Sequence, residues 1–203
     1  ALLERKGART GIINTEGFRD VLEMRRRDRP TTWGLKGSFT PVVDRMDRVE
    51  VAERVLADGT ILIEVDEEAV RERAKELAAR GCEAACIFFL NAYVNPANEA
   101  RAAAAVRSVW PNAYVTAATE ILPEIREFER LSTATLNAYL QPVVSSYLDR
   151  LETGLARQGF SGEILIVQSN GGVMSVDIAK RYPVRTALSG PAAGVIAATA
   201  IAE

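Results

Sequence analysis

The apolar run at residues 84–90, with the sequence AACIFFL, constrains the fold of this chain more than any other feature. A strand that is apolar at every position has to bury both faces, as strands of a parallel sheet do when helices cover both sides. Residues 67–80 before the run and 97–110 after it repeat apolar side chains at helical spacing. Strands and helices that alternate in this way predict an α/β fold with right-handed crossovers.

Turn and cap residues mark the ends of these elements. The Asp66 carboxylate is expected to accept hydrogen bonds from the free amides that begin the helix over residues 67–80. Gly81 follows that helix at the position where a left-handed backbone conformation commonly ends helices. Asp58-Gly59 predicts a hairpin turn between the two short strands that flank it.

The first 50 residues predict one strand, one helix and a long loop. Residues 9–15 (RTGIINT) are typical of a short strand, and the Thr15 hydroxyl is expected to cap a helix over residues 16–24. The arginine-rich run at residues 25–29 fits either a solvated helix end or a surface that steers an anionic substrate. Residues 31–47 have no clear periodicity, and long loops in compact domains are often functional.

The pattern changes after residue 122. Residues 127–158 carry apolar side chains at helical spacing, and Pro142 within them is expected to kink or divide the helix. Residues 163–168 (EILIVQ) predict a buried strand. We therefore divide the chain into two partial domains, at residues 1–122 and 123–203.

Composition excludes several kinds of site. The chain of 203 residues has no histidine, which removes a Ser-His-Asp triad, a Cys-His pair and any zinc site that needs imidazole. Its two cysteines, Cys82 and Cys86, are too few for a zinc shell or a disulfide framework. We interpret them as buried thiols on one face of a strand, and expect a cytoplasmic protein.

Charge and hydropathy make two classes of partner unexpected. A net charge of −2, from 25 basic and 27 acidic residues, favours neither a nucleic-acid surface nor an anionic membrane. No apolar run approaches the ~20 residues of a membrane span. Chemistry on this chain has to use carboxylates, lysine, hydroxyls, thiols or backbone amides.

Two glycine-containing segments are candidate binding sites. The first, at the end of an apolar strand, is Ser169, Asn170, Gly171 and Gly172, where backbone amides could approach an anion or a polar substrate. An ordinary glycine turn is the alternative.

The second segment, residues 189–194 (SGPAAG), is a loop entering a helix near Pro191. The free amides of a helix start suit a phosphate or a carboxylate, whereas small residues also suit close packing. Neither a P-loop nor a dinucleotide fingerprint occurs in the chain.

A third candidate is a cluster of charged residues between the two predicted domains. It consists of Glu120, Glu124, Glu127 and Glu129 with Arg126 and Arg130. Such a cluster could hold a metal ion or supply a general base. Glu–Arg pairs on a solvated helix face are the alternative.

Several segments together resemble the hydantoinase A/oxoprolinase family, which includes N-methylhydantoinases and the related subunits of acetone and acetophenone carboxylases. The matching segments are residues 1–11 (ALLERKGARTG), 15–23 (TEGFRDVLE), 89–93 (FLNAY), 95–99 (NPANE), 136–139 (LNAY), 142–143 (PV), 168–172 (QSNGG) and 189–195 (SGPAAGV). They are colinear and span nearly the whole chain, which makes the resemblance specific although each match alone is weak.

The resemblance implies an actin-like ATPase fold, with two RNase H-like halves around a nucleotide. It implies an ATP-dependent hydrolase of cyclic amides, with ATP and Mg²⁺ as cofactors and a hydantoinase B-type subunit as partner. ATP would phosphorylate an amide or ketone oxygen. A carboxylase acting on a ketone, or a non-catalytic nucleotide-sensing scaffold, is the alternative.

The resemblance also implies which residues take part. Ser169, Asn170, Gly171 and Gly172, followed by Ser189, Gly190 and Gly194, are expected to line the interdomain cleft, whereas no general base or metal ligand is assigned. The family's two glycine-rich phosphate loops fall outside residues 1–203. We therefore expect the chain by itself to be inactive, to bind no cofactor and to self-associate through uncovered apolar faces. Asn14 stands where the family pattern has threonine.

Overall fold

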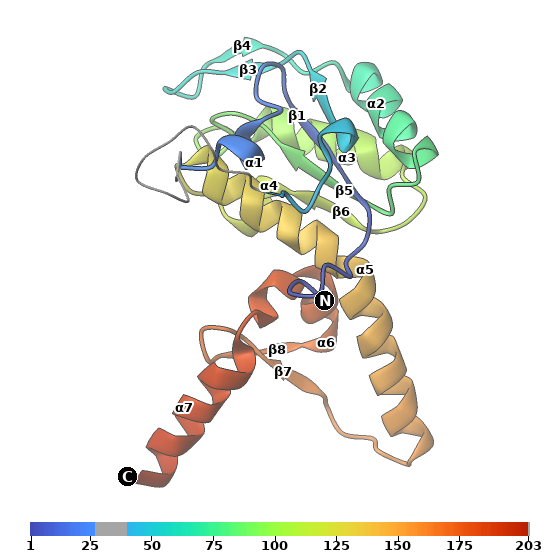
Figure 1. Cartoon of the computed structure of the whole chain (residues 1–203), viewed down its shortest axis with the longest axis vertical. Coiled ribbons are helices and arrows are strands. Elements are labelled where there is room, and N and C mark those ends of the chain that lie inside the picture. The colour runs from blue at the N-terminus through green and yellow to red at the C-terminus, as the bar shows by residue number, and fades with distance from the viewer. Residues whose placement is uncertain (27–39, 203) are drawn as a thin grey trace. The chain divides into compact units, whose positions relative to one another are not determined.

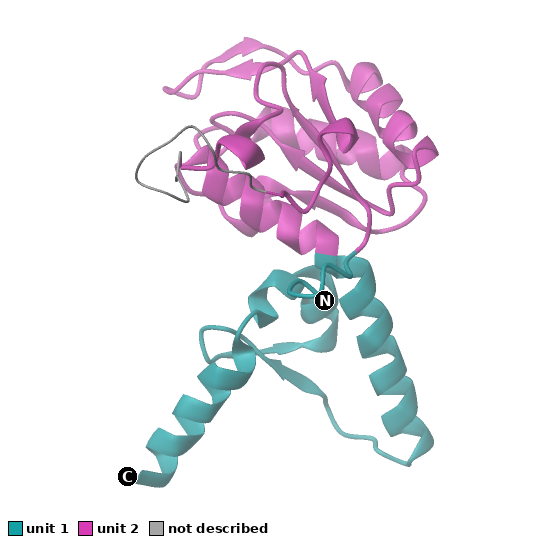
Figure 2. Ribbon diagram, in the orientation of Figure 1, with its two compact units in different colours: residues 1–7, 140–203 teal, residues 8–139 magenta. Residues whose placement is uncertain are grey.

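The computed structural model describes residues 1–26 and 40–202. The chain divides into two compact units, which Figure 2 distinguishes by colour. One unit is Ala8–Tyr139, and the other consists of Ala1–Gly7 with Leu140–Glu203. The boundary that we predict between residues 122 and 123 concerns domains of the complete fold and stays a prediction.

The unit at residues 8–139 is built on a parallel four-stranded sheet, as the apolar run at residues 84–90 predicts (Figure 1). The strands, in sheet order, are β2 (Arg48–Val51), β1 (Thr10–Thr15), β5 (Ala84–Phe88) and β6 (Val115–Ala117). All five residues of β5 are buried, so the sheet is covered on both sides at its centre.

Helices form a layer on each face of this sheet. On one face, α2 (Glu67–Ala79) and α3 (Ala97–Val109) pack against Ile13 and Ile87. On the other face, the first part of α5 (Glu127–Arg157) packs against Ile12, Cys86 and Phe88. The contacting residues are Val70, Ala74 and Leu77 of α2, Ala102, Ala103 and Val106 of α3, and Leu131, Ala134 and Ala138 of α5. This three-layer arrangement confirms the predicted α/β fold.

The local signals in this unit are largely confirmed. The Asp66 side chain accepts hydrogen bonds from the amides of Glu68 and Ala69 at the start of α2, and Gly81 has a φ of +85° just after its end. Strands β3 (Arg54–Val55) and β4 (Ile61–Ile63) form an antiparallel hairpin. Gly59 lies in its turn with a φ of +87°, a conformation that favours glycine.

The predicted helix over residues 16–24 is wrong in length and in its cap. Only α1 (Val21–Met24) is helical, and the Thr15 hydroxyl bonds Glu53 and the amide of Leu90 instead. These distant partners satisfy the hydroxyl, so it does not cap a helix. Of the predicted loop at residues 31–47, residues 31–39 lie outside the described part, and Arg45–Asp47 form a short 3₁₀ helix, η1.

The two cysteines are buried and free, as predicted, but they do not share a face. Cys86 lies within β5, whereas Cys82 precedes the strand, which begins at Ala84. Consequently Cys82 packs in the core under α2 and α3, and Cys86 packs in the core under α5. Burial raises the pKa of the Cys82 thiol to about 11 and raises that of Cys86 further, so neither is a ready nucleophile.

Pro142 does not divide α5, which the structure describes as one helix of 31 residues. An interior proline costs a helix ~3 kcal/mol. Buried residues lie on both sides of Pro142 along the helix. Ala138 packs in the core under the first part of α5, and Leu148 packs in the core of the second unit. We attribute the continuity of the helix to this packing.

The second unit has a smaller core around a two-stranded hairpin. Strands β7 (Leu165–Val167) and β8 (Val173–Ser175) pair antiparallel and are followed by α6 (Val176–Arg181), the 3₁₀ helix η2 (Pro183–Thr186) and α7 (Ser189–Ala202). Its buried core residues are Leu148, Met174, Val176 and Ala179. A strand forms within residues 163–168 as predicted, at β7. The prediction that this strand is buried is wrong, because the Leu165 side chain is 50% exposed.

Helix α7 begins two residues earlier than the proline at its start predicts. Pro191 lies in the first turn, where a missing amide breaks no helical hydrogen bond. Among its described residues none is buried, and Val195, Ile196 and Ile201 are exposed apolar side chains. In the described part of the chain, no helix is long and apolar enough to cross a membrane.

Candidate functional site

Buried polar side chains gather at the carboxyl ends of the parallel strands, the edge where α/β sheets commonly bind ligands. Glu53, which follows β2, is 2% exposed. One of its carboxylate oxygens accepts from the Thr15 hydroxyl at the end of β1, and the other accepts from the Asn98 amide at 3.0 Å. Burial raises the pKa of Glu53, although both hydrogen bonds oppose the shift.

A second buried carboxylate, Glu99 of α3, joins the ends of β5 and β6. Its Oε1 accepts from the amide and the hydroxyl of Thr119, both at 2.7 Å, and its Oε2 accepts from the amide of Phe89 at 2.9 Å. Glu99 is fully buried, and burial raises its pKa against the effect of these donors. Its three acceptor contacts give it a structural role.

Arg130, in the first part of α5, is fully buried near Glu99. It donates one hydrogen bond to the carbonyl of Phe89 at 2.9 Å, and its guanidinium carbon lies 4.8 Å from the Phe88 ring centre and 5.4 Å from that of Tyr93. Burial lowers its pKa, whereas the charge of Glu99 raises it. Its Nε and Nη1 find no hydrogen-bond partner among the described residues.

Asn14, in β1, is also buried with unsatisfied polar atoms. It is 0% exposed, and neither its amide nitrogen nor its amide oxygen has a partner in the described part of the chain. Asn14 lies beside Phe88 in the sheet register, the residue whose ring Arg130 covers. A buried polar atom without a hydrogen-bond partner lowers the stability of the fold, so its presence needs an explanation. This end of the sheet is therefore a candidate functional region.

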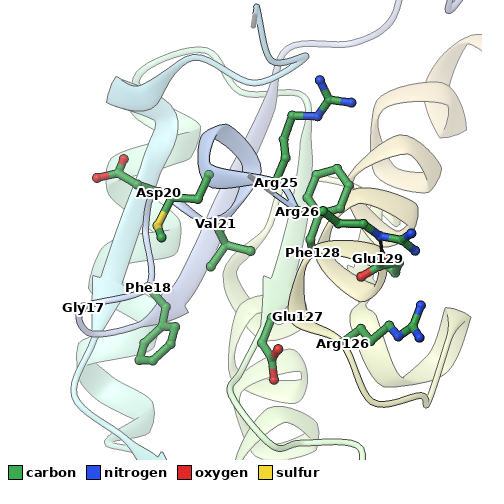
Figure 3. A pocket seen from close by; sticks show the side chains of 11 residues that line it. Gly17, Phe18, Asp20, Val21, Arg25, Arg26, Arg126, Glu127, Phe128 and Glu129 are labelled. Atoms are coloured by element: carbon green, nitrogen blue, oxygen red, sulfur yellow. Dashed lines mark hydrogen bonds and ion pairs between the residues drawn. The ribbon is translucent and has the colours of Figure 1, made fainter. Parts of the chain in front are cut away.

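A pocket of about 780 Å³ lies in the same unit, between the segment after β1 and the first turn of α5 (Figure 3). We call it the α5 pocket. It is lined by Gly17, Phe18, Asp20, Val21, Met24, Arg25, Arg26, Arg126, Glu127, Phe128 and Glu129. Its volume falls within the range of small-molecule sites.

Several charged residues of the α5 pocket already have partners. Asp20 receives two hydrogen bonds from Arg45, at 2.8 and 3.0 Å, and these hold the pKa of its carboxyl below the ordinary value. Arg26 pairs with Glu129, which Figure 3 marks with a dashed line. The guanidinium of Arg25 lies 6.0 Å from the Phe128 ring centre.

Two charged residues of the pocket remain available. Within residues 1–26 and 40–202, the side chains of Arg126 and Glu127 form no hydrogen bond and no ion pair. Arg126 immediately precedes α5 with a φ of +93°, and Glu127 begins the helix. Counting contacts among the described residues only, the α5 pocket therefore combines one unpaired cation, one unpaired carboxylate and the positive end of a long helix.

The predicted acidic cluster separates into ion pairs and pocket residues. Glu120 accepts two hydrogen bonds from Arg107, at 2.8 and 3.0 Å, and Glu129 pairs with Arg26. Among the residues that the structure describes, no group of three His, Cys, Asp or Glu side chains could hold a metal ion. The metal-site interpretation is wrong for the described residues, because Glu120 and Glu129 pair with arginines and the four carboxylates do not converge on one point.

The predicted arginine run at residues 25–29 falls partly on the α5 pocket. Arg25 and Arg26 line it, and residues 27–29 lie outside the described part. Sequence reasoning did not single out Glu53 or Glu99. A signal existed for Glu99, which precedes Ala102 by three residues and therefore shares the buried stripe of α3.

The predicted Ser-Asn-Gly-Gly segment is the turn between β7 and β8. The amide and hydroxyl of Ser169 both donate to the carbonyl of Arg185, at 2.8 and 2.7 Å, and the amide of Gly172 donates to the Asn170 side chain at 2.9 Å. Gly171 has a φ of +85°. These donors are used within the turn or by the neighbouring Arg185 carbonyl, which favours the ordinary-turn alternative.

The other predicted residues, Ser189, Gly190 and Gly194, lie in α7 of the same unit. The structure brings this helix against the Ser-Asn-Gly-Gly turn, since a Cβ added to Gly171 would collide with the Ile196 side chain. The two predicted segments are thus neighbours through a close packing contact. Whether they line an interdomain cleft stays a prediction.

Comparison with known proteins decides the family. Residues 1–110 match the family model of the hydantoinase/oxoprolinase N-terminal region, and residues 130–203 match the model of hydantoinase/oxoprolinase. The chain belongs to the hydantoinase/oxoprolinase family. The predicted resemblance is confirmed.

Two curated relatives show how much of the family the chain covers. It is 38% identical to an uncharacterized protein of Methanocaldococcus jannaschii, over 92% of this chain and 28% of that protein. It is 31% identical to the caprolactamase subunit alpha of Pseudomonas jessenii, over 100% of this chain and 30% of that subunit. The chain thus spans less than a third of the length of these relatives.

Solved structures share the fold of this chain. The nucleotide-free structure of acetone carboxylase, described by its ATP-dependent acetone carboxylation, matches with a TM-score of 0.82 and 27% identity, over 98% of this chain and 30% of its own. The ATP-dependent caprolactamase from Pseudomonas jessenii matches with a TM-score of 0.77 and 32% identity, over 85% of this chain and 26% of its own. The relatives thus include ATP-dependent enzymes acting on a cyclic amide and on a ketone.

Proposed function

We propose that the full-length protein is an ATP-dependent hydrolase of cyclic amides. The observation that supports this most is the 31% identity, over the whole chain, to the alpha subunit of an enzyme named for a cyclic amide. The α5 pocket supports it further, because aromatic walls and charged side chains at the carboxyl end of a parallel sheet suit a small polar ring.

An amide carbonyl is a poor electrophile, which is why such an enzyme would need ATP. ATP would supply a phosphoryl group to the amide oxygen, which would make the ring carbon a better electrophile. Water would then add to that carbon and the ring C–N bond would break, and a second water would hydrolyse the resulting acyl phosphate to release phosphate. The products are the ring-opened amino acid, ADP and phosphate. Because the described residues contain no acidic cluster fit for Mg²⁺, we assign no residue of this chain to the metal.

The residues of this chain would bind and position the organic substrate. Phe18 and Phe128 would exclude water from one side of the ring, and Arg126 and Glu127 would orient its polar groups. Since the caprolactamase relative is named as a subunit, we also propose a partner of the hydantoinase B type.

The test is ADP release by the full-length protein, with and without its partner subunit. The panel contains caprolactam, hydantoin, 5-oxoproline and acetone. We expect at least one cyclic amide to raise ADP release above the substrate-free rate, with one ADP formed per ring opened. If no cyclic amide does so in the presence of the partner, the proposed function is wrong.

Carboxylation of a ketone is a second candidate, favoured by the match to acetone carboxylase over 98% of the chain. The two functions differ in their requirement for bicarbonate. A carboxylase would release ADP with acetone only when bicarbonate is present and would incorporate labelled carbon into the product. A cyclic-amide hydrolase would show neither property.

A further inference from the structure

We propose that Arg130 is a positioning residue, which fixes one wall of the α5 pocket against the end of β5. We call this wall the α5 wall. It consists of residues 126–129, which line the pocket and immediately precede Arg130. The inference rests on the proposed function, because it takes the pocket as the site of the organic substrate. It adds the side chain that keeps this site in shape.

Arg130 is the first buried residue of α5. Arg126 is exposed and residues 127–129 are half-buried, whereas Arg130 and Leu131 are 0% exposed. The apolar packing of α5 against the sheet begins only with Leu131 and continues at Ala134. The α5 wall is therefore the partly exposed start of a helix, and Arg130 is the nearest buried side chain that can hold it.

The contacts of Arg130 lead to the end of β5. Its Nη2 donates a hydrogen bond to the carbonyl of Phe89 at 2.9 Å, and its guanidinium carbon lies 4.8 Å from the Phe88 ring centre. The amide of Phe89 donates in turn to Glu99 of α3, also at 2.9 Å. Because Phe89 is held from both sides, Arg130 attaches the start of α5 to a fixed point of the fold.

The opposite wall of the pocket is attached to the next residue of the same segment. That wall begins at Gly17, two residues after Thr15, and the Thr15 hydroxyl accepts a hydrogen bond from the amide of Leu90 at 2.9 Å. The attachments of the two walls thus lie on neighbouring residues, Phe89 and Leu90. Loss of the Arg130 contact would release one wall relative to the other.

An ion pair at the surface also joins the two walls, but it is a weaker attachment. Arg26 of one wall pairs with Glu129 of the other, and their side chains are 57% and 24% exposed. Ion pairs that water reaches contribute little to stability and are screened by salt. The buried contact of Arg130 is therefore the better candidate for holding the α5 wall in place.

The environment of Arg130 is unfavourable for a purely stabilising role. Its Nε and Nη1 have no hydrogen-bond partner within the described residues, and burial lowers its pKa. Glu99 depends little on it: burial raises the pKa of Glu99, and Arg130 contributes least among the groups that lower it. Replacing a buried charged side chain by an apolar one of similar size often leaves stability unchanged or raises it.

The first measurement uses the full-length protein with its partner subunit and the variant Arg130→Met. Methionine keeps an unbranched side chain but cannot donate to Phe89. We expect a urea midpoint no lower than that of the wild type. With the cyclic amide that gives the most ADP release in the panel, KM for the amide should rise about 10-fold, which corresponds to one lost hydrogen bond from a charged group. KM for ATP should stay the same.

The second measurement needs no substrate. In a regular helix the amides of residues 130–133 donate to the carbonyls of residues 126–129, so their hydrogen exchange reports the opening of the α5 wall. Arg130→Met should accelerate this exchange about 10-fold and leave the amides of β5 unchanged. This result decides the inference even if no cyclic amide is turned over, an outcome that refutes only the proposed function.

Three further variants separate positioning from stability. Arg130→Lys keeps a donor for the Phe89 carbonyl and should recover most of the lost affinity for the amide. Arg150→Met, at an exposed position of α5 outside the pocket, should change neither KM nor exchange. Leu77→Ala, in the core under α2, should lower the urea midpoint but leave the ratio of the two KM values unchanged.

Several results would overturn the inference. An Arg130→Met protein that does not fold, or that raises both KM values equally, would show that Arg130 serves the fold rather than the pocket. Unchanged exchange at residues 130–133 would show that the α5 wall is held by other contacts. An Arg130→Lys protein as impaired as Arg130→Met would show that the hydrogen bond to Phe89 is not what matters.

Discussion

The two units of the chain differ in how they treat polar groups. In the unit at residues 8–139, carboxylates such as Glu53 and Glu99 are buried and hydrogen-bonded at the ends of a covered sheet. In the other unit, the polar residues of the β7–β8 turn are exposed, and α7 buries none of its described residues. The two glycine-containing motifs lie in the unit with the smaller core, whereas the buried carboxylates lie in the unit at residues 8–139.

This contrast teaches that a recognisable motif and a costly arrangement are separate signals. Ser169 and Gly171 stand out in the sequence because glycine turns are easy to see, yet their amides already donate, to the carbonyls of Arg185 and Gln168. Asn14 and Arg130 belong to no glycine motif, but their buried polar atoms, which lack partners among the described residues, are expensive in the folded chain.

Matched leucine truncations should give the largest difference. Leu77→Ala removes a fully buried side chain from the core under α2 and should lower the free energy of unfolding by about 3 kcal/mol. Leu165→Ala, at a position that is 50% exposed, should cost under ~1 kcal/mol. Urea denaturation measures both, and similar losses would show that the second unit is packed as densely as the first.

Glu99→Gln should be the next most damaging change, at about 2 kcal/mol. Both Glu99 oxygens accept from donors, so either orientation of a glutamine amide places its NH₂ against the N–H of Phe89 or Thr119. The measurement is again urea denaturation, with Glu64→Gln at an exposed position as the control. A loss no greater than that of the control would argue against the described network.

The pH dependence of this loss has a definite sign. Burial raises the pKa of Glu99, so the folded chain keeps the proton over a window in which the unfolded chain has lost it. The contribution of Glu99 to stability is therefore full below the ordinary carboxyl pKa and declines as the pH rises through the raised value. The stability difference between the wild type and Glu99→Gln should be largest in acid, and a difference that grows with pH would contradict the shift.

Replacing Asn14 should have a smaller effect of the opposite sign. Because the amide of Asn14 is buried without partners in the described part of the chain, Asn14→Leu should raise the free energy of unfolding by about 1 kcal/mol. The side chains are similar in volume, which limits overpacking. A loss of more than about 1 kcal/mol on denaturation would show that the amide has a partner in the folded protein.

Ser169→Ala should have the smallest effect, about 0.5 kcal/mol. It removes one exposed hydrogen bond, which the Ser169 hydroxyl donates to the carbonyl of Arg185. The hydrogen bond from the Ser169 backbone N–H to the same carbonyl remains. Hydrogen exchange of the β7 and β8 amides is the suitable measurement, because it reports local opening. A loss of protection as large as that caused by Leu77→Ala in β5 would reverse the contrast between the units.

Much of the fold could be predicted because its signals are local. The apolar run at residues 84–90, the Asp66 cap and the Asp58-Gly59 turn each depend on neighbouring residues, and all three appear as expected. The predicted Thr15 cap fails because the partners of its hydroxyl, Glu53 and Leu90, lie 38 and 75 residues away in the sequence. Long-range pairing of that kind leaves no periodic pattern in the sequence.

The candidate site was predicted less well for the same reason. Sequence proximity groups Glu127 and Glu129 with Glu120. In the structure, however, Glu120 forms an ion pair with Arg107 and Glu129 forms one with Arg26. The α5 pocket is formed by two segments about 100 residues apart, which only the fold brings together. Sequence reasoning found most of its charged residues without their arrangement.

The hydroxyl of Thr15 has a mechanical consequence. It joins the exits of β1 and β5 and the segment that follows β2, because it accepts from Leu90 and donates to Glu53. Just beyond it the chain turns at Gly17 into the wall of the α5 pocket. This one oxygen fixes the position of the chain just before the residues that line the pocket. A substitution at Thr15 would therefore change the shape of the pocket without replacing any of its lining residues.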